Sequence, residues 1–242
     1  MERLVLVHGS VSGGRPTWSG QRAGLRDRFR LVVLERPGFP PNPPVERVDF
    51  EEHARLVADE LVDGDHLVGH SYGGVIALLA AAAVADRLGS LTVIEPPCTS
   101  VASGDPAADR FAEEGRRWWA EGPRDDPEAF LRGFLRYVGS GYVPPSPLPP
   151  QLEQAARTLV VERGPWEAEI PLEQLAAARL PVLVVSGAHH EAFDSICAVL
   201  AERLRAERLV LPGYGHNPQL HPDFNDRLAA FVERAARRHA GT

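Results

Sequence analysis

The sequence predicts an α/β protein with a mainly parallel sheet flanked by helices. Short apolar runs, beginning with residues 4–7, alternate along the chain with longer stretches of helical spacing or composition. This alternation indicates βαβ units, in which a right-handed crossover returns each strand parallel to the one before it. The chain has 242 residues and is 44% hydrophobic, enough for one sizeable domain with an insertion. The loops that follow the strands should then gather at one edge of the sheet, where such proteins bind ligands.

The first part of the chain supplies four expected strands and the helices between them. Residues 4–7 form a continuous apolar run that ends at His8-Gly9, which is typical of a strand buried on both faces. Asp49 stands where an N-cap is needed for the helix that follows it. Residues 40–44 are rich in proline and can be neither helix nor central strand. The expected strands cover residues 4–7, 30–34, 66–68 and 91–94, and the expected helices 22–29, 50–62 and 76–85.

The pattern changes between residues 99 and 179, where no convincing strand occurs. This segment has four helical stretches and a connector rich in proline and glycine, at residues 109–120, 127–138, 151–161 and 172–178, with the connector at 139–150. We therefore expect a core formed by residues 1–98 and 180–242 and a helical cap, or lid, formed by residues 99–179. In the second part of the core, strands are expected at 181–186 and 208–211 and helices at 195–205 and 225–238.

Composition excludes several classes of function. The formal net charge of −7 argues against nucleic acid as a partner. All 26 basic residues are arginine, so Schiff-base, pyridoxal-phosphate and P-loop chemistry, which need lysine, are excluded. Cys98 and Cys197 lie far apart and suggest neither a zinc site nor a disulfide framework. The chain opens without a signal-peptide pattern and its longest apolar run, residues 75–85, is too short to span a bilayer, so we expect a cytoplasmic protein with no membrane partner.

A serine between glycines is the strongest candidate for chemistry. The stretch from residue 66 to residue 75 runs from an apolar strand through Gly69-His70-Ser71-Tyr72-Gly73 into an alanine-rich helix. This is the strand, tight turn and helix in which Gly-x-Ser-x-Gly forms a nucleophile elbow. Glycine is needed there because strand and helix approach too closely for larger side chains. Ser71 is therefore the candidate nucleophile.

Four motifs in one order resemble the α/β-hydrolase fold superfamily, of the type with a serine nucleophile and a helical cap. They are His8-Gly9, the segment at residues 35–39 (Glu-Arg-Pro-Gly-Phe), the elbow around Ser71, and Gly213-Tyr214-Gly215-His216. The resemblance covers residues 1–97 and 180–232 and leaves the cap unmatched. It implies that His216 is the base that activates Ser71. It also implies an oxyanion hole formed by backbone N–H groups of Tyr72 and of Ser10 or Val11, and no cofactor or metal.

The acid that should orient His216 is not in its usual place. Most members of the superfamily carry an aspartate three residues after the glycine that ends the penultimate strand, where this chain has a second histidine in His189-His190. Glu95, directly after the fourth strand, is the first candidate because it resembles the position of the acid in haloalkane dehalogenases. Asp194, which could instead N-cap the following helix, and Glu191 are the alternatives. Adjacent histidines rarely bind one metal ion, and no spaced third ligand is evident.

The expected function is that of a serine hydrolase. Ser71 and His216 with a carboxylate would cleave an ester or thioester of a small to medium, partly apolar substrate through an acyl-enzyme. Two alternatives remain open on the sequence. One is a cofactor-free lyase or haloperoxidase-like enzyme that uses the same triad. The other is a non-catalytic relative that binds a ligand, and the sequence leaves the oligomeric state open.

Overall fold

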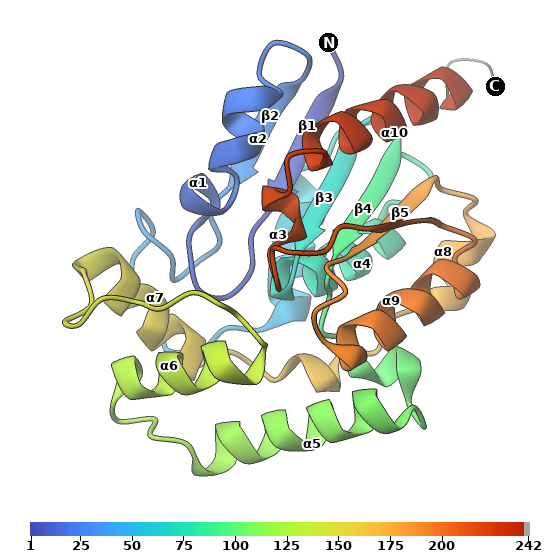
Figure 1. Cartoon of the computed structure of the whole chain (residues 1–242). Helices are drawn as coiled ribbons and strands as arrows, with labels where there is room; N and C mark the ends of the chain where they lie inside the picture. Colours follow the sequence, from blue (N-terminus) through green and yellow to red (C-terminus); the bar gives the residue numbers. More distant parts are fainter. Residues whose placement is uncertain (240–242) are drawn as a thin grey trace.

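A six-stranded parallel sheet forms the centre of the molecule. The computed structural model describes residues 1–239, so that the last three residues of the expected core range, 240–242, lie outside it. The strands follow the order β2-β1-β3-β4-β5-β6, and every neighbouring pair is parallel (Figure 1). The predicted α/β architecture is confirmed. The strands are β1 (Arg3–Val7), β2 (Arg30–Leu34), β3 (His66–His70), β4 (Ser90–Ile94), β5 (Val182–Ser186) and β6 (Glu207–Val210).

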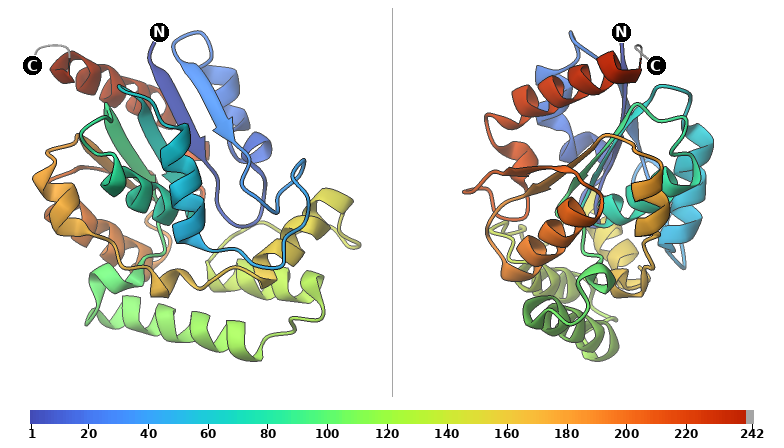
Figure 2. Two further views of the ribbon diagram at one scale, coloured as in Figure 1. Left: turned by 180° about the vertical axis from the view of Figure 1, so that it is seen from behind. Right: turned by 90° about the vertical axis from the view of Figure 1, so that its right-hand side faces the viewer.

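Helices cover both faces of the sheet. Alternate residues of β1 show why: Val5 and Val7 face the cluster that contains α3, α4 and α9, whereas Leu4 and Leu6 face Trp18 and α10. Figures 1 and 2 show α10 on one face and α3 and α4 on the other. Helices in and around this core are α1 (Gly14–Thr17), α2 (Ser19–Gly24), α3 (Phe50–Glu60), α4 (Tyr72–Ala83), α9 (Glu191–Arg203) and α10 (Phe224–His239).

The segment between β4 and β5 carries no strand of the sheet and consists of helices. Three of them lie beyond the carboxyl ends of the strands, at the bottom of Figure 1, and the fourth, α8, packs on α4 through the hydrogen bond of Gln174 Nε2 to the Ala82 carbonyl at 2.9 Å. These helices are α5 (Pro106–Glu121), α6 (Pro127–Tyr137), α7 (Pro150–Val160) and α8 (Leu172–Ala177). Short 3₁₀ turns cover Thr99–Ala102, Pro165–Glu167 and Pro218–Leu220.

Two helix starts differ from the prediction. Helix α4 begins at Tyr72 and not at residue 76, because the glycines that weaken its helical signal are held in the helix by tertiary contacts. Helix α9 begins at Glu191 and not at residue 195, because the His190 side chain caps it by accepting from Ala192 N, so that the expected N-cap role of Asp194 is wrong. Asp49 caps α3 as predicted, accepting from the N–H groups of Glu51 and Glu52. Within residues 1–239 no helix combines the length and apolar character needed to cross a membrane.

Candidate active site

Ser71 stands at a sharp turn between β3 and α4. Its φ of 54° and ψ of −126° lie in a region that residues with a side chain rarely adopt. A backbone held in such a region stores about 1–3 kcal/mol, which the surrounding structure must offset. The turn brings the Ser71 hydroxyl to the carboxyl end of the central strands, where the wall of a pocket forms. This is the strained geometry expected of a nucleophile elbow.

Backbone crowding explains the glycines of the elbow. A Cβ on Gly73 would lie 2.4 Å from the His8 carbonyl oxygen and 2.5 Å from that of Val7. A Cβ on Gly69 would lie 2.3 Å from the Gly73 carbonyl oxygen. Real Cβ atoms do not approach backbone oxygens so closely, so both positions require glycine. The same close approach brings the loop after β1 beside Ser71.

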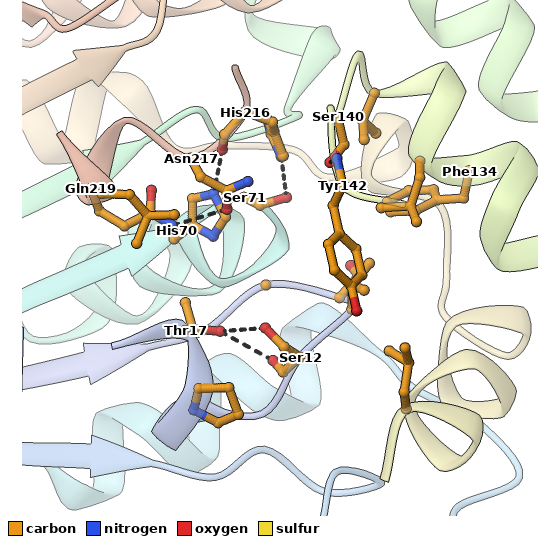
Figure 3. A pocket seen from close by; sticks show the side chains of 18 residues that line it. Ser12, Thr17, His70, Ser71, Phe134, Ser140, Tyr142, His216, Asn217 and Gln219 are labelled. Atoms are coloured by element: carbon orange, nitrogen blue, oxygen red, sulfur yellow. Dashed lines mark hydrogen bonds between the residues drawn. The ribbon is translucent and has the colours of Figure 1, made fainter. Parts of the chain in front are cut away.

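A chain of hydrogen bonds joins Ser71, His216 and Glu95, three residues that lie far apart in the sequence. The Ser71 hydroxyl donates to His216 Nε2 at 2.8 Å (Figure 3). The other ring nitrogen of His216, Nδ1, donates to Glu95 Oε2 at 2.9 Å. His216 comes from the loop after β6, and Glu95 directly follows β4. The structure thus brings together the predicted nucleophile, the predicted base and the first candidate for the acid.

Glu95 is held as a carboxylate in a fully buried position. Its Oε1 accepts from the backbone N–H of Gly187 at 2.6 Å, while its Oε2 faces His216. Burial by itself raises the pKa of Glu95, but the imidazoles of His189 and His216 lower it to about 2. The side chain therefore stays ionised at neutral pH, as a group that fixes the tautomer of a neighbouring imidazole must.

The other two candidates for the acid lie elsewhere. Asp194 sits in the first turn of α9, with its Oδ1 3.6 Å from Arg208 Nη2 and a side chain that is 38% exposed. The Glu191 side chain is 86% exposed and lies 3.7 Å from Arg110 Nη2. Neither carboxylate is hydrogen-bonded or ion-paired to His216, whereas Glu95 is.

His189 joins the candidate site, which the sequence pattern did not indicate. Its Nδ1 lies 3.3 Å from Glu95 Oε2, and its Nε2 donates to the carbonyl of Val138, at the end of α6. Burial lowers the pKa of His189, but the Glu95 carboxylate outweighs it and raises the pKa above its ordinary value. Within residues 1–239, Glu95, His189 and His216 form a group whose nitrogen and oxygen ligand atoms lie within 4.8 Å of one another, close enough for a metal ion. A metal on His216 Nδ1 would replace the hydrogen bond to Glu95.

A pocket of about 380 Å³ opens beside Ser71 and His216. Apolar side chains from the inserted helices line one side of it, and the loop after β1 lines the other (Figure 3). Ser10 and Ser71 both line the pocket, and Tyr72 is the first residue of α4, where helical N–H groups have no intrahelical acceptor. Side chains in the lining include Ser12, Thr17, Phe134, Leu135, Val138, Ser140, Tyr142, Leu152, Asn217 and Gln219.

Three buried histidines beside the site predict a loss of stability in acid. Burial, the largest cause in each case, lowers the pKa of His8 well below 6.5 and the pKa values of His53 and His70 to about 3. The positive charge of Arg36 adds to the shift for His8 and His53. The unfolded chain, with ordinary histidines, therefore binds more protons than the folded one between about pH 3 and pH 6.5.

We expect the free energy of unfolding contributed by these histidines to be full above about pH 6.5 and to fall as the pH decreases below it. Urea unfolding between pH 5 and pH 7 measures the slope. His53→Gln should reduce it by about one proton, roughly 1.4 kcal/mol per pH unit. An unchanged slope in this variant would contradict the assignment.

The chain matches a known family over most of its length. Residues 4–228 match the model of the alpha/beta hydrolase family. A pimeloyl-acyl carrier protein methyl ester esterase of Aeromonas hydrophila is 37% identical over 177 residues, which are 72% of this chain and 64% of that protein. A protein of the same name from Pectobacterium carotovorum is 27% identical over 242 residues, covering 95% of this chain and 94% of the relative.

A solved structure gives the same result for the fold. An esterase from Thermogutta terrifontis, solved with malate bound, aligns with a TM-score of 0.64 over 98% of this chain and 90% of that chain, at 22% identity. At this identity the likeness concerns the architecture alone. The family match itself extends from β1 into α10 and includes all six strands of the sheet. The chain therefore belongs to the alpha/beta hydrolase family.

Proposed function

We propose that this protein is a serine esterase that hydrolyses uncharged carboxylic esters through an acyl-enzyme. One observation carries the proposal: the continuous hydrogen-bond chain from the Ser71 hydroxyl through His216 to the buried Glu95 carboxylate. A serine hydroxyl becomes a nucleophile only when an adjacent base removes its proton, and the base acts only in the right tautomer. A protein that only binds a ligand would not need this hydrogen-bond chain, nor a serine held on a strained turn.

In the proposed mechanism, Ser71 Oγ attacks the ester carbonyl while its proton passes to His216 Nε2. The negative charge that develops on the carbonyl oxygen is stabilised by the N–H groups of Ser10 and Tyr72. His216 then gives the proton to the departing alcohol, and the acyl group remains on Ser71. Water, deprotonated by His216, releases the acid and restores the serine. Throughout these steps the Glu95 carboxylate compensates the imidazolium charge.

The composition of the pocket supports an uncharged substrate. Its described lining residues include serine, threonine, asparagine, glutamine and apolar side chains, but no aspartate, glutamate or arginine. A carboxylate brought into this lining would lose its hydration without gaining a charged partner. The Aeromonas and Pectobacterium relatives are named for a methyl ester of a pimeloyl-acyl carrier protein. From that name we extend the ester class to this chain.

We further propose that the segment formed by residues 99–179 acts as a cap. Phe134, Leu135 and Val138 of α6 and its C-terminal end lie in the pocket lining opposite the loop after β1. Apolar side chains in this position exclude water from the ester and leave room for an acyl chain or an alcohol. The cap would thereby decide which esters reach Ser71.

A fluorophosphonate probe tests the proposal. We expect the native protein to be phosphonylated at Ser71, as located by tandem mass spectrometry, and the heat-denatured protein to remain unlabelled. We also expect turnover of 4-nitrophenyl butanoate, because the ester is neutral and short enough for the pocket. The matched control is 4-nitrophenyl hydrogen succinate, whose terminal carboxylate should lower kcat/KM at least tenfold, about 1.4 kcal/mol or more. A folded protein that reacts with neither probe nor ester would favour the binding alternative.

A further inference from the structure

A buried ion pair joins the inserted helical segment to the edge of the candidate active site. Arg36 Nη2 donates to Glu162 Oε1 at 2.8 Å, and the two side chains are 2% and 1% exposed. Arg36 belongs to the segment after β2, and Glu162 follows α7, where the insertion forms a parallel bridge with Val48. Desolvation of two charges costs several kcal/mol each, and apolar residues of the same volume often stabilise a protein as well or better. A contribution to the stability of the fold therefore does not explain why this ion pair is present.

The second contact of the guanidinium gives a better reason. Arg36 Nη1 donates to the carbonyl of Gly9 at 2.8 Å. The same carbonyl accepts from His8 Nδ1 at 2.9 Å, and His8 Nε2 accepts from the backbone N–H of Arg36 at 3.1 Å. These bonds fix His8 as the neutral tautomer with its proton on Nδ1, in agreement with the lowered pKa of this histidine, of which burial is the largest cause. Two donors thus hold the Gly9 carbonyl in one direction.

The Gly9 carbonyl and the Ser10 N–H belong to the same peptide unit. In a planar trans peptide the two groups point in opposite directions, so a donor that holds the carbonyl also sets the direction of the N–H. Ser10 lines the pocket together with Ser71. A cationic donor on the carbonyl also polarises the peptide and makes its N–H a stronger donor.

The guanidinium also touches the residue that supplies the second oxyanion donor. The Arg36 carbon Cζ lies 4.7 Å from the centre of the Tyr72 ring and 4.9 Å from that of Phe39. Both rings pack against the guanidinium, and Arg36 Nε donates to His53 Nδ1 at 3.3 Å. All three nitrogens of the guanidinium therefore have partners, and the group has little freedom to turn away from Gly9.

We propose that Arg36, held in place by Glu162, is a positioning residue for the oxyanion hole: it fixes the Gly9–Ser10 peptide so that the Ser10 N–H faces the developing negative charge. This inference rests on the proposed function, because it assigns a task in ester hydrolysis. It also gives the insertion a second task, since Glu162, which follows α7, ties the position of Arg36 to the docking of the helices. Arg36 itself touches neither the ester nor Ser71 in this arrangement.

The decisive variant replaces both charges by isosteres. Arg36→Met/Glu162→Gln keeps the side-chain volumes and leaves no unpaired charge buried. It removes the Arg36 hydrogen bonds to the Gly9 carbonyl and to residue 162. We expect this protein to fold with a Tm close to that of the wild type or above it. We expect its kcat for 4-nitrophenyl butanoate to fall about 10- to 100-fold, somewhat less than for complete removal of an oxyanion donor. KM should change less than threefold.

Phenylboronic acid provides a readout that a structural role would not move. It adds to the serine hydroxyl and forms a tetrahedral anion, so its inhibition constant should rise in the same proportion as kcat falls. Arg163→Met is the matched control, since Arg163 is the next residue after Glu162 and pairs with Glu51 and Glu167 without a contact to Gly9. Its kcat should stay within twofold of the wild type. Arg36→Lys keeps the charge beside Glu162 but cannot reproduce the fork, and we expect a smaller loss of kcat.

The outcomes separate this inference from the proposed function. Wild-type kcat and boronate affinity in the double variant overturn the positioning role, and wild-type values in Arg36→Lys do so if the double variant does not fold. A higher KM with unchanged kcat overturns it as well. Failure of the wild-type protein to hydrolyse the ester is seen before any variant is made, and overturns the proposed function together with this inference.

Discussion

Glu95→Gln is expected to lower kcat about 10³- to 10⁴-fold, the size of effect seen when the acid of a serine triad is replaced by its amide. The physical reason lies in the tautomer of His216. A carboxylate can only accept from Nδ1, at 2.9 Å in this structure, which leaves Nε2 free to take the Ser71 proton. A glutamine can present its NH₂ group to Nδ1 and stabilise the tautomer that has the proton on the wrong nitrogen. Burst-phase and steady-state kinetics with 4-nitrophenyl esters measure the loss.

Asp194→Asn is the matched control, because it makes the same chemical change at the rival carboxylate. Asp194 is partly exposed and lies 3.6 Å from Arg208, so the substitution should alter the free energy of unfolding by less than about 1 kcal/mol. Its kcat should remain close to that of the wild type. A large loss of kcat in Asp194→Asn together with an active Glu95→Gln variant would move the acid to the first turn of α9.

Gly73→Ala is expected to prevent formation of the native fold. The added Cβ would meet the carbonyl oxygens of Val7 and His8 at 2.5 and 2.4 Å, and both belong to the backbone of the central strand β1 and its end. Neither the strand nor α4 can move away without opening the sheet beside Ser71. We expect destabilisation above about 4 kcal/mol, in the range reserved for severe steric or core defects. Thermal unfolding followed by circular dichroism, or the loss of folded protein on purification, provides the measurement.

Gly20→Ala is the control for this substitution. Gly20 lies within α2, and a Cβ there would have no atom within 4 Å. Alanine in a helix is favoured over glycine by about 0.5–1 kcal/mol, so this variant should be slightly more stable than the wild type. If Gly73→Ala unfolded at the temperature of Gly20→Ala, the crowding at the elbow would not be the reason for its glycine.

His189 explains how a chain without the usual acid can hold Glu95 as an anion. Its Nδ1 and that of His216 both lie near Glu95 Oε2, at 3.3 and 2.9 Å, and the Gly187 N–H binds the other oxygen. The N–H groups of His216 and Gly187 donate to the two carboxylate oxygens, and His189, when protonated, adds a positive charge beside Oε2. The charged form of Glu95 thereby gains what burial costs it. The Nε2 of His189 reaches the Val138 carbonyl of the inserted segment. Glu95 is thus connected both to the base and to the pocket wall.

Much of the fold was predictable because it depends on local pattern. A strand that is apolar on both faces, such as β1, must be covered by helices on both sides. The alternation of such strands with helical stretches then predicts a parallel sheet. The first residues of α4 and α9 were harder to predict from the sequence. Glycine at residues 73 and 74 weakens the helical signal, and a histidine cap at residue 190 is not a usual helix start, so both helices begin where tertiary contacts allow them to.

By itself the sequence determined the family, the sheet and the position of Ser71, because steric demands on a tight turn are local and leave glycines at fixed spacing around the serine. It also provided His216, which stands just after the last strand, at the same edge of a parallel sheet as the serine. Only the tertiary structure decided which carboxylate reaches His216. Glu95, Glu191 and Asp194 all follow strands that end at this edge, and a choice between them requires distances of a few ångströms. The same holds for the contact of Arg36 with Gly9 and Glu162, since a long side chain and a distant insertion meet only once the layers are packed.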